Sequence, residues 1–181
     1  MKDQSHTTYV CRGDRKNTYL AFFVFLGLAV LGMLAAALHL TSEVIAQAIA
    51  FIAFIVAAYI FIRFIATVYR YELIAEEEGD YLLIIRIQGK KEFTQRKSAL
   101  SCLAAIYTVD TARGIKPEHP KLPLFNYSSH LFAESYTLLQ FEGEDPALFR
   151  INADDAFLEA LAAYLPKEEA SKEYPEENDN D

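Results

Sequence analysis

Two long runs of apolar residues constrain this chain more than any other feature. Residues 18–40 form a run of 23 residues without Asp, Glu, Lys or Arg, and residues 44–68 form a run of 25 whose only charge is Arg63. A helix needs about 20 apolar residues to cross the roughly 30 Å hydrocarbon core of a bilayer, so both runs are long enough. The short connection between them leaves room only for a tight turn. The sequence therefore predicts a transmembrane α-helical hairpin over residues 18–68.

Basic residues flank the outer ends of the two runs, whereas the turn between them has none. They are Arg12, Arg15 and Lys16 before the first run, and Arg63 and Arg70 at the end of the second. Because Lys and Arg favour the cytoplasmic side, we expect a multi-pass protein of the cell membrane with both termini in the cytoplasm. The first run exceeds the apolar region of about 7 to 15 residues in a secretory signal, which favours a span over a cleaved signal.

Arg63 lies five residues before Val68, about 7 to 8 Å from the predicted end of the second span. Its side chain is long enough to snorkel to the headgroups, and we expect Tyr59, Tyr69 and Arg70 to join it as membrane-interface anchors. The alternative is that Arg63 belongs to an ion or proton pathway, a hypothesis that any charge within a span suggests. Neither run contains an acidic residue that could pair with it.

Small residues recur in both runs at spacings of three and four, which places each set on one helix face. They are Ala29, Gly32 and Ala36 in the first run, and Ala46, Ala50, Ala53 and Ala57 in the second. Small side chains allow two helix backbones to approach closely, so we expect a packed seam between the helices.

After residue 68 the apolar pattern changes to the alternation of β-strands, which predicts a mainly-β soluble domain over residues 69–166. The strand candidates are 71–76, 81–88, 92–96, 101–109, 125–132, 135–141 and 147–151. Residues 110–124 contain one Gly and three Pro and predict a loop. A final helix is expected to follow Asn152 as its cap, to carry Phe157, Leu161 and Leu165 on one face with Leu161 buried, and to end at Pro166.

The remaining segments are an N-terminal cytoplasmic segment over residues 1–17 and an acidic tail over residues 167–181, which we expect to be disordered. From residue 69 onward the chain has 12 Lys and Arg against 22 Asp and Glu, a balance that excludes a nonspecific nucleic-acid binder. The two cysteines, Cys11 and Cys102, lie far apart, which argues against a disulfide scaffold or zinc site and favours a reducing compartment.

The order of elements resembles small uncharacterised bacterial membrane proteins in which a two-helix transmembrane hairpin leads into a pleckstrin-homology-like (PH-like) domain. The segments that carry the likeness are VYRYEL, RIQGKKEF, SYTLLQFEG and ALFRINADDAFLEALAAYL. The resemblance implies a PH-like barrel of about seven strands with a C-terminal helix that closes one end. It implies no reaction, cofactor or catalytic residue.

Motifs of catalysis and of metal binding are absent from the sequence. It contains no H-E-x-x-H, P-loop, G-x-S-x-G or G-x-G-x-x-G, and no two of its four histidines share a helical spacing of four. The adjacent acids Asp154 and Asp155 are explained by the start of a helix. Cys11 is either a palmitoylation candidate beside the first span or an ordinary thiol. We therefore expect no enzyme, no cofactor and no metal site.

A basic hairpin offers the strongest candidate site. Its residues are Arg86, Lys90, Lys91, Arg96 and Lys97. In PH domains that bind lipids, a basic hairpin early in the barrel holds the anionic headgroup, and each Lys or Arg near an anionic leaflet contributes about 1 kcal/mol. The alternative is a solvated turn that keeps exposed strands soluble.

Two functions therefore compete. The first is a membrane-anchored PH-like interaction module on the cytoplasmic face, which binds or scaffolds a membrane or cytoplasmic protein. The second is a sensor of anionic lipid headgroups through residues 86–97. A membrane enzyme is disfavoured because the motifs of catalysis are absent.

Overall fold

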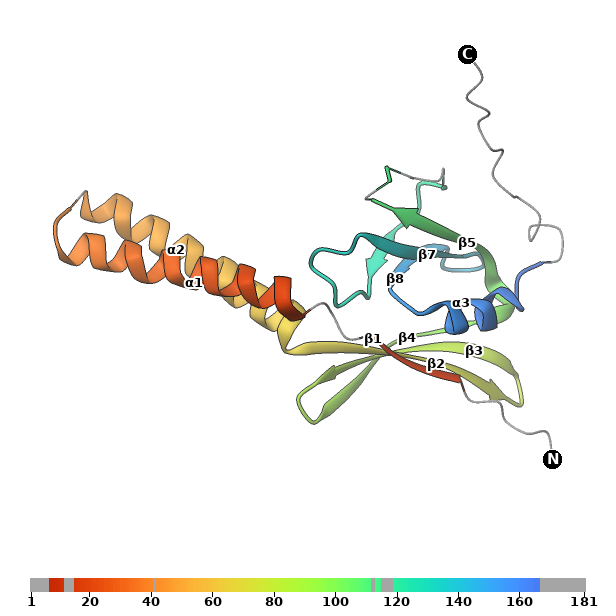
Figure 1. The fold of residues 1–181 in the computed structure, drawn as a ribbon. Coiled ribbons are helices and arrows are strands. Elements are labelled where there is room, and N and C mark those ends of the chain that lie inside the picture. Colours follow the sequence, from red (N-terminus) through yellow and green to blue (C-terminus); the bar gives the residue numbers. More distant parts are fainter. Residues whose placement is uncertain (1–6, 12–14, 41, 112, 115–118, 167–181) are drawn as a thin grey trace, which may run out of the picture.

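The computed structural model describes residues 7–11, 15–40, 42–111, 113–114 and 119–166. A helical hairpin projects from one side of a β domain (Figure 1). The acidic tail predicted over residues 167–181 lies outside the described residues. The N-terminal segment predicted over residues 1–17 is described only at residues 7–11 and 15–17.

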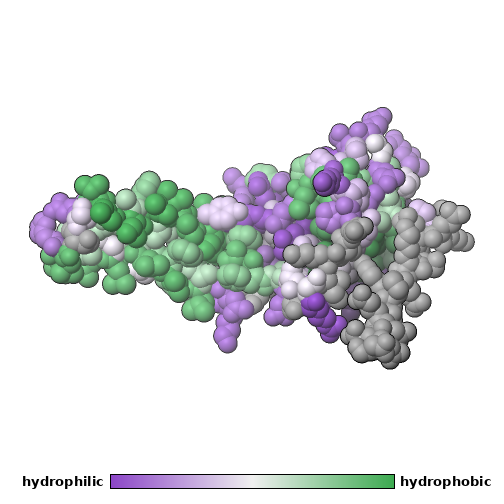
Figure 2. Space-filling model, turned by 90° about the horizontal axis from the view of Figure 1, so that it is seen from above, coloured by the Kyte–Doolittle hydropathy of each residue, from purple (hydrophilic) through white to green (hydrophobic). Residues whose placement is uncertain are grey.

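The hairpin consists of α1, Arg15–Ala37, and α2, Glu43–Ile60, and a π-helical turn, η1, continues α2 over Phe61–Ile65. Both helices are long and apolar enough to cross a membrane, as predicted. Figure 2 shows a hydrophobic surface along the hairpin, with hydrophilic residues at the turn and on the β domain. The second helix ends at Ile65 and not at residue 68, because the alternating burial of a strand already begins at Thr67.

Small residues form the contact between α1 and α2. The buried ones are Ala29, Ala36, Ala46, Ala50, Ala53 and Ala57. A Cβ atom on Gly32 would lie 3.0 Å from the Cβ of Ala50 and 3.1 Å from the carbonyl oxygen of Ala46. The backbones therefore approach so closely that a side chain at Gly32 would force them apart, which confirms the predicted seam.

The first sheet has the order β1-β2-β3-β4, and all its neighbours are antiparallel. Its strands are β1, Thr7–Cys11; β2, Thr67–Glu76; β3, Gly79–Gln88; and β4, Lys91–Ala99. The β3–β4 turn contains Gly89 at a φ of 61°, a conformation that favours glycine. Strand β1 precedes the hairpin in the sequence, and the sequence analysis did not predict it.

The second sheet follows a short 3₁₀ turn, η2, over Leu100–Cys102 and has the order β5-β7-β8-β6. Its strands are β5, Leu103–Asp110; β6, Leu124–Asn126; β7, Ser135–Phe141; and β8, Ala147–Ile151. Strand β6 runs parallel to β8, and the other pairs are antiparallel. The two sheets are separate in the described chain and do not close into one barrel.

One core fills the space between the two sheets, and the helix α3, Asp155–Ala162, lies between them (Figure 1). The largest fully buried side chains include Tyr71, Leu82, Ile84, Leu139, Phe149, Phe157 and Leu161. The ring of Phe157 lies 6.0 Å from those of Tyr9 and Tyr71, so α3 packs on the first sheet through β1 and β2. The predicted burial of Leu161 is confirmed, and Phe157 is buried with it.

Three further local predictions were wrong. The final helix ends at Ala162 and not at Pro166, because the amides of Tyr164 and Leu165 bond to carbonyls three residues back and tighten the chain into turns. The strand expected over residues 125–132 is limited to Leu124–Asn126, because the Asn126 and Ser128 side chains accept from the backbone amides of Ser128 and His130 and turn the chain. The cap of α3 is Asp154, whose Oδ1 accepts from the Phe157 amide at 2.9 Å. Asn152, the expected cap, donates instead to the Ser135 carbonyl at 2.7 Å.

Candidate functional site

The junction between η1 and β2 fixes the β domain to the hairpin. Ala66 is the only residue between the two elements, and its amide donates to the Phe61 carbonyl at 2.8 Å. The Thr67 hydroxyl donates to the Ile62 carbonyl at 2.7 Å and accepts from Gln88 Nε2 at 3.0 Å. The last helical turn is therefore hydrogen-bonded, through Thr67, to the end of β3.

A second connection joins the same sheet to the start of α1, the first helix of the hairpin. Strand β1 ends at Cys11, with three residues between it and Arg15, where α1 begins, and Cys11 pairs with Tyr69 of β2. Both ends of the hairpin thus lead into neighbouring antiparallel strands. A domain held by two short connections has far less freedom to turn than one on a single flexible linker.

Arg63 provides a third connection, to the second sheet. Its Nη2 donates to the carbonyl oxygen of Asn126, the last residue of β6, at 2.8 Å. Its guanidinium also lies 5.1 Å from the ring centroids of Phe64 and Tyr69. The side chain that was expected to reach toward headgroups therefore contacts the β domain. We call the part of the domain around Thr67, Gln88 and Asn126 the hairpin end.

The two tyrosines expected at the membrane interface have different environments. Tyr59 is exposed on the outer surface of α2, edge-on to Phe64 at 6.1 Å, where an interface anchor would lie. Tyr69 is buried in the core of the domain, and its ring lies 6.0 Å from that of Tyr127. Tyr69 therefore packs between the sheets and is not accessible to headgroups.

Arg70 lies on the first sheet and is paired with two glutamates. Its Nη1 and Nη2 donate to the carboxylate of Glu92 at 3.0 and 2.7 Å, and its Nε lies 2.6 Å from a carboxylate oxygen of Glu72. The hydrogen bonds to Glu92 raise the pKa of Arg70. This bidentate pair links β2 to β4 across β3 and compensates the charge that was expected to face the membrane.

The register of the first sheet brings the β3–β4 turn to the hairpin end. Gln88 pairs with Thr67, the first residue of β2, so the turn Gly89–Lys90 follows immediately beside the end of the helix. Figure 1 shows this turn extending toward the side of the domain that carries the hairpin. Lys90 and Lys91 are exposed, and within the described chain neither makes an ion pair.

The other three basic residues of the predicted cluster do not share the turn. Arg86 lies over the ring of Phe93 at 5.3 Å. Lys97 pairs with Glu76 at 2.6 Å, about 20 Å along β4 from Lys91 at about 3.3 Å per residue. Arg96 points to the other face of β4, where it lies 5.7 Å from the ring of Phe149 and 3.7 Å from an Asp145 oxygen. The five residues therefore do not form one site.

Within the described residues, no group of three or more His, Cys, Asp and Glu side chains is placed to hold a metal ion. Two of the buried titratable groups near the hairpin end are Cys11 and Tyr71. Burial raises the pKa of the Cys11 thiol and raises that of the Tyr71 hydroxyl well above its ordinary value. The Tyr71 hydroxyl donates to the Tyr127 carbonyl at 2.9 Å. Both side chains belong to the core of the domain.

Sequence reasoning missed all three residues that define the hairpin end: Thr67, which was placed inside the predicted span 44–68, Gln88 and Asn126. Gln88 could have been found, because a strand that pairs with β2 through a two-residue turn must return to the start of β2. Asn126 has no local signal, because its role is played by a backbone carbonyl that any residue could supply.

Comparisons of the chain with protein-family models, with curated protein sequences and with solved structures give no match.

Proposed function

We propose that this chain is a membrane-anchored interaction module. The hairpin crosses the cell membrane with both termini in the cytoplasm, and the β domain binds or scaffolds a protein partner at the cytoplasmic face. The observation that carries the proposal is the triple connection at the hairpin end: the η1–β2 junction, the pairing of β1 with β2, and the hydrogen bond from Arg63 to Asn126. A domain that only needed attachment would not require a fixed orientation.

Binding without catalysis is supported by the interior of the domain. The Tyr71 hydroxyl in this interior is hydrogen-bonded to the Tyr127 carbonyl, and the core is made mainly of aromatic and aliphatic side chains. We further infer that the domain is PH-like and open between β4 and β5, because two mostly antiparallel sheets followed by one helix enclose a single core. This fold carries binding functions on its edges and loops, so it favours an interaction module only by analogy.

The test is to release the domain without unfolding it. Flexible Gly-Ser insertions of about ten residues after Ala66 and after Gly13 would each add a coil with a reach of roughly 16 to 19 Å. The same insertion between Glu77 and Glu78, in the β2–β3 turn at the far end of the first sheet, is the matched control. Proteins that co-purify with the full chain in mild detergent are compared with those that co-purify with residues 15–66 alone.

We expect a set of proteins that requires the β domain, that survives the control insertion, and that is lost when both junctions are lengthened. Partners that survive the double insertion would show that orientation has no role. A full chain that retains no protein beyond those retained by the hairpin would contradict the proposal itself.

A second function, contact with anionic lipid headgroups, is favoured by one observation. The exposed pair Lys90 and Lys91 lies at the hairpin end, next to the helix that would enter the bilayer, and has no acidic partner among the described side chains. Each lysine near an anionic leaflet contributes about 1 kcal/mol, so the pair would give a selectivity of roughly 30-fold at low salt. The site is thus narrower than the predicted cluster 86–97.

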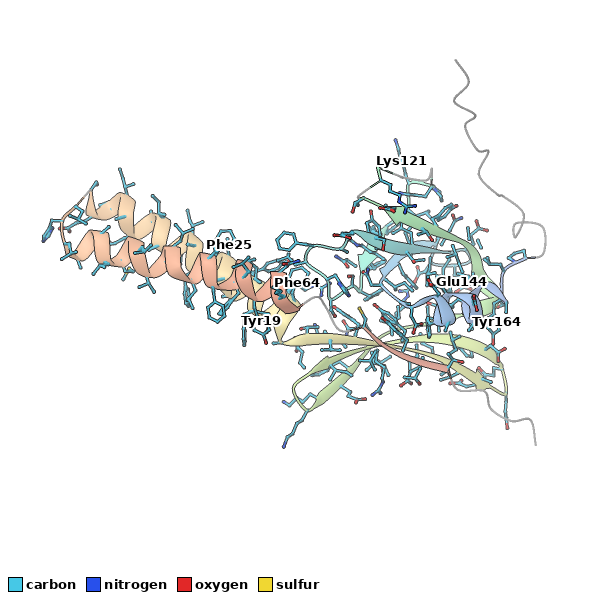
Figure 3. The ribbon with its side chains drawn as sticks, viewed as in Figure 1. Tyr19, Phe25, Phe64, Lys121, Glu144 and Tyr164 are labelled. Atoms are coloured by element: carbon cyan, nitrogen blue, oxygen red, sulfur yellow. The ribbon has the colours of Figure 1, made fainter. Side chains whose placement is uncertain are left out.

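The full chain reconstituted in bilayers tests this second function. The association of a spin-labelled anionic lipid, relative to its zwitterionic analogue, should fall in the double variant Lys90→Gln and Lys91→Gln. The control double variant, Lys97→Gln and Lys121→Gln, removes the same two charges away from the turn (Figure 3). The selectivity should also decrease with added salt. Equal selectivity in both double variants would assign Lys90 and Lys91 to solubility alone.

A further inference from the structure

The loop between β6 and β7, residues 127–134, begins beside the membrane-spanning helix. The residue before it, Asn126, accepts the hydrogen bond from Arg63 at 2.8 Å, and Arg63 belongs to η1, inside the candidate span Glu43–Ile65. In the ribbon the loop reaches from the β domain toward the end of the hairpin that carries Phe64 (Figures 1 and 3). The loop therefore starts within one side-chain length of the last turn of that helix.

The loop is held in place from within. Ser128 and Ser129 are buried, and the Tyr127 ring belongs to the core. At its other end the Thr111 hydroxyl donates to the Glu134 carbonyl at 2.6 Å, and the Thr111 amide donates to the same oxygen at 2.7 Å. These contacts fix both ends of the loop, so its exposed residues are presented in a set position.

Phe132 is the exposed apolar residue that this loop presents. Its side chain is 59% exposed, more than any other large apolar residue described in the β domain. Leaving such a side chain in water forgoes part of the free energy that burying an aromatic ring would contribute. Phe132 follows Leu131, which is half-buried, so two large apolar residues are consecutive in this loop.

The hairpin itself indicates what covers Phe132. Its outward apolar surface continues through Phe61 and Ile62, both exposed, up to the residue before Arg63. Lipid that covers Phe61 and Ile62 would extend to the turn of the helix that carries Arg63. The loop begins at the residue after Asn126, to which Arg63 is hydrogen-bonded. We propose that Phe132 inserts into the membrane interface as a further membrane contact of the β domain, with the glycerol and upper acyl region of the bilayer as its partner.

The absence of Trp from the sequence allows a direct test. Phe132→Trp places a single fluorophore in the loop, and Tyr164→Trp places one at a residue that is 37% exposed on the side of the domain away from the hairpin (Figure 3). Phe54→Trp, in the middle of α2, reports on the hairpin. Each full-length variant is reconstituted in phosphatidylcholine bilayers, which carry no net charge, with bromine on the acyl chains near the glycerol or near the chain end.

We expect the emission of Phe132→Trp to be shifted to the blue of Tyr164→Trp, quenched most by shallow bromine and shielded from aqueous iodide. Tyr164→Trp should be quenched by iodide and not by bromine. Quenching of Phe132→Trp by iodide alone, or a blue shift without bromine quenching, would overturn the inference, since the latter means that protein covers the ring.

The inference depends on the hairpin crossing the bilayer, and Phe54→Trp separates the two claims. Deep bromine should quench Phe54→Trp strongly. If it does so while Phe132→Trp remains in water, the loop contact is wrong and the anchored domain stands. If Phe54→Trp is not quenched, the membrane assignment fails and the loop contact fails with it.

Discussion

The hairpin and the β domain contain similar apolar side chains and arrange them in opposite ways. In the hairpin the buried residues are mainly alanines, whereas Leu31 and Ile52 face outward. In the β domain Leu139 and Phe149 are fully buried and charged residues lie outside. The difference is the one expected if the hairpin spans a membrane, as we propose: lipid gives no hydrophobic reason to bury a leucine, so helices there associate by close backbone packing. Water does give that reason, so the domain builds an aromatic core.

The comparison predicts that a buried charge destroys one region and leaves the other intact. Leu161→Asp places a carboxylate against the core and should destabilise the β domain by about 4 kcal/mol or more, enough to unfold it. Ala162→Asp adds the same charge at the next residue of α3, which is exposed, and should leave the fold unchanged. Near-ultraviolet circular dichroism of the full chain in detergent reports on the domain, and retained helical signal reports on the hairpin. Equal melting of the two variants would mean that α3 does not close the core.

The stability of the hairpin should depend on the size of the side chains between its helices, whereas that of the β domain depends on keeping charge out of its core. Gly32→Leu introduces a side chain where a Cβ already meets Ala50 at 3.0 Å and should cost about 1 to 3 kcal/mol. Gly27→Leu is the matched control, because a Cβ there meets nothing within 4 Å. The measurement is helix loss during titration with sodium dodecyl sulfate. A lower midpoint for Gly27→Leu than for Gly32→Leu would contradict the packed seam.

A smaller loss of stability is expected at the start of α3, where the substitution removes a helix cap and leaves the core unchanged. Asp154→Ala removes the acceptor of the Phe157 amide and should lower the stability of the β domain by about 1 kcal/mol. Asp154→Asn keeps an oxygen in the same place and should restore most of the loss. Chemical denaturation of the domain measures both. If Asp154→Ala is neutral, the side chain does not act as a cap.

Sequence patterns predicted the regions whose signals are local. The two spans follow from uniform composition over more than 20 residues, and β7 and β8 follow from short apolar runs between turns. Strand β1 was missed because five residues carry little pattern, and their partner Tyr69 lies on the other side of the whole hairpin in the sequence. Asn152 and Asp154 are equally good caps by type, and only a contact with Ser135, distant in sequence, decided between them.

The candidate site was predictable in part for the same reason. The exposed turn at Lys90 and Lys91 could be predicted from adjacent residues, because Gly89 indicates a turn and the two lysines indicate exposure to solvent. Alternation along a strand would have separated Arg96 from Lys97, since neighbours in a strand point to opposite faces. The connection from Arg63 to the second sheet could not be predicted, because an arginine near the end of a span has the same composition signal whether it reaches lipid or protein.

The central claim is that the hairpin crosses the membrane and holds the β domain on the cytoplasmic side. Labelling of single cysteines in intact cells with a membrane-impermeant thiol reagent tests it most directly. Cys102→Ser provides the background, since Cys11 is fully buried with a raised thiol pKa and should react slowly. Ser42→Cys, in the turn between the helices, should be labelled in intact cells. Glu144→Cys, exposed on the β domain, should be labelled only after permeabilisation (Figure 3). Labelling of Glu144→Cys in intact cells, with Ser42→Cys protected, would contradict the claim.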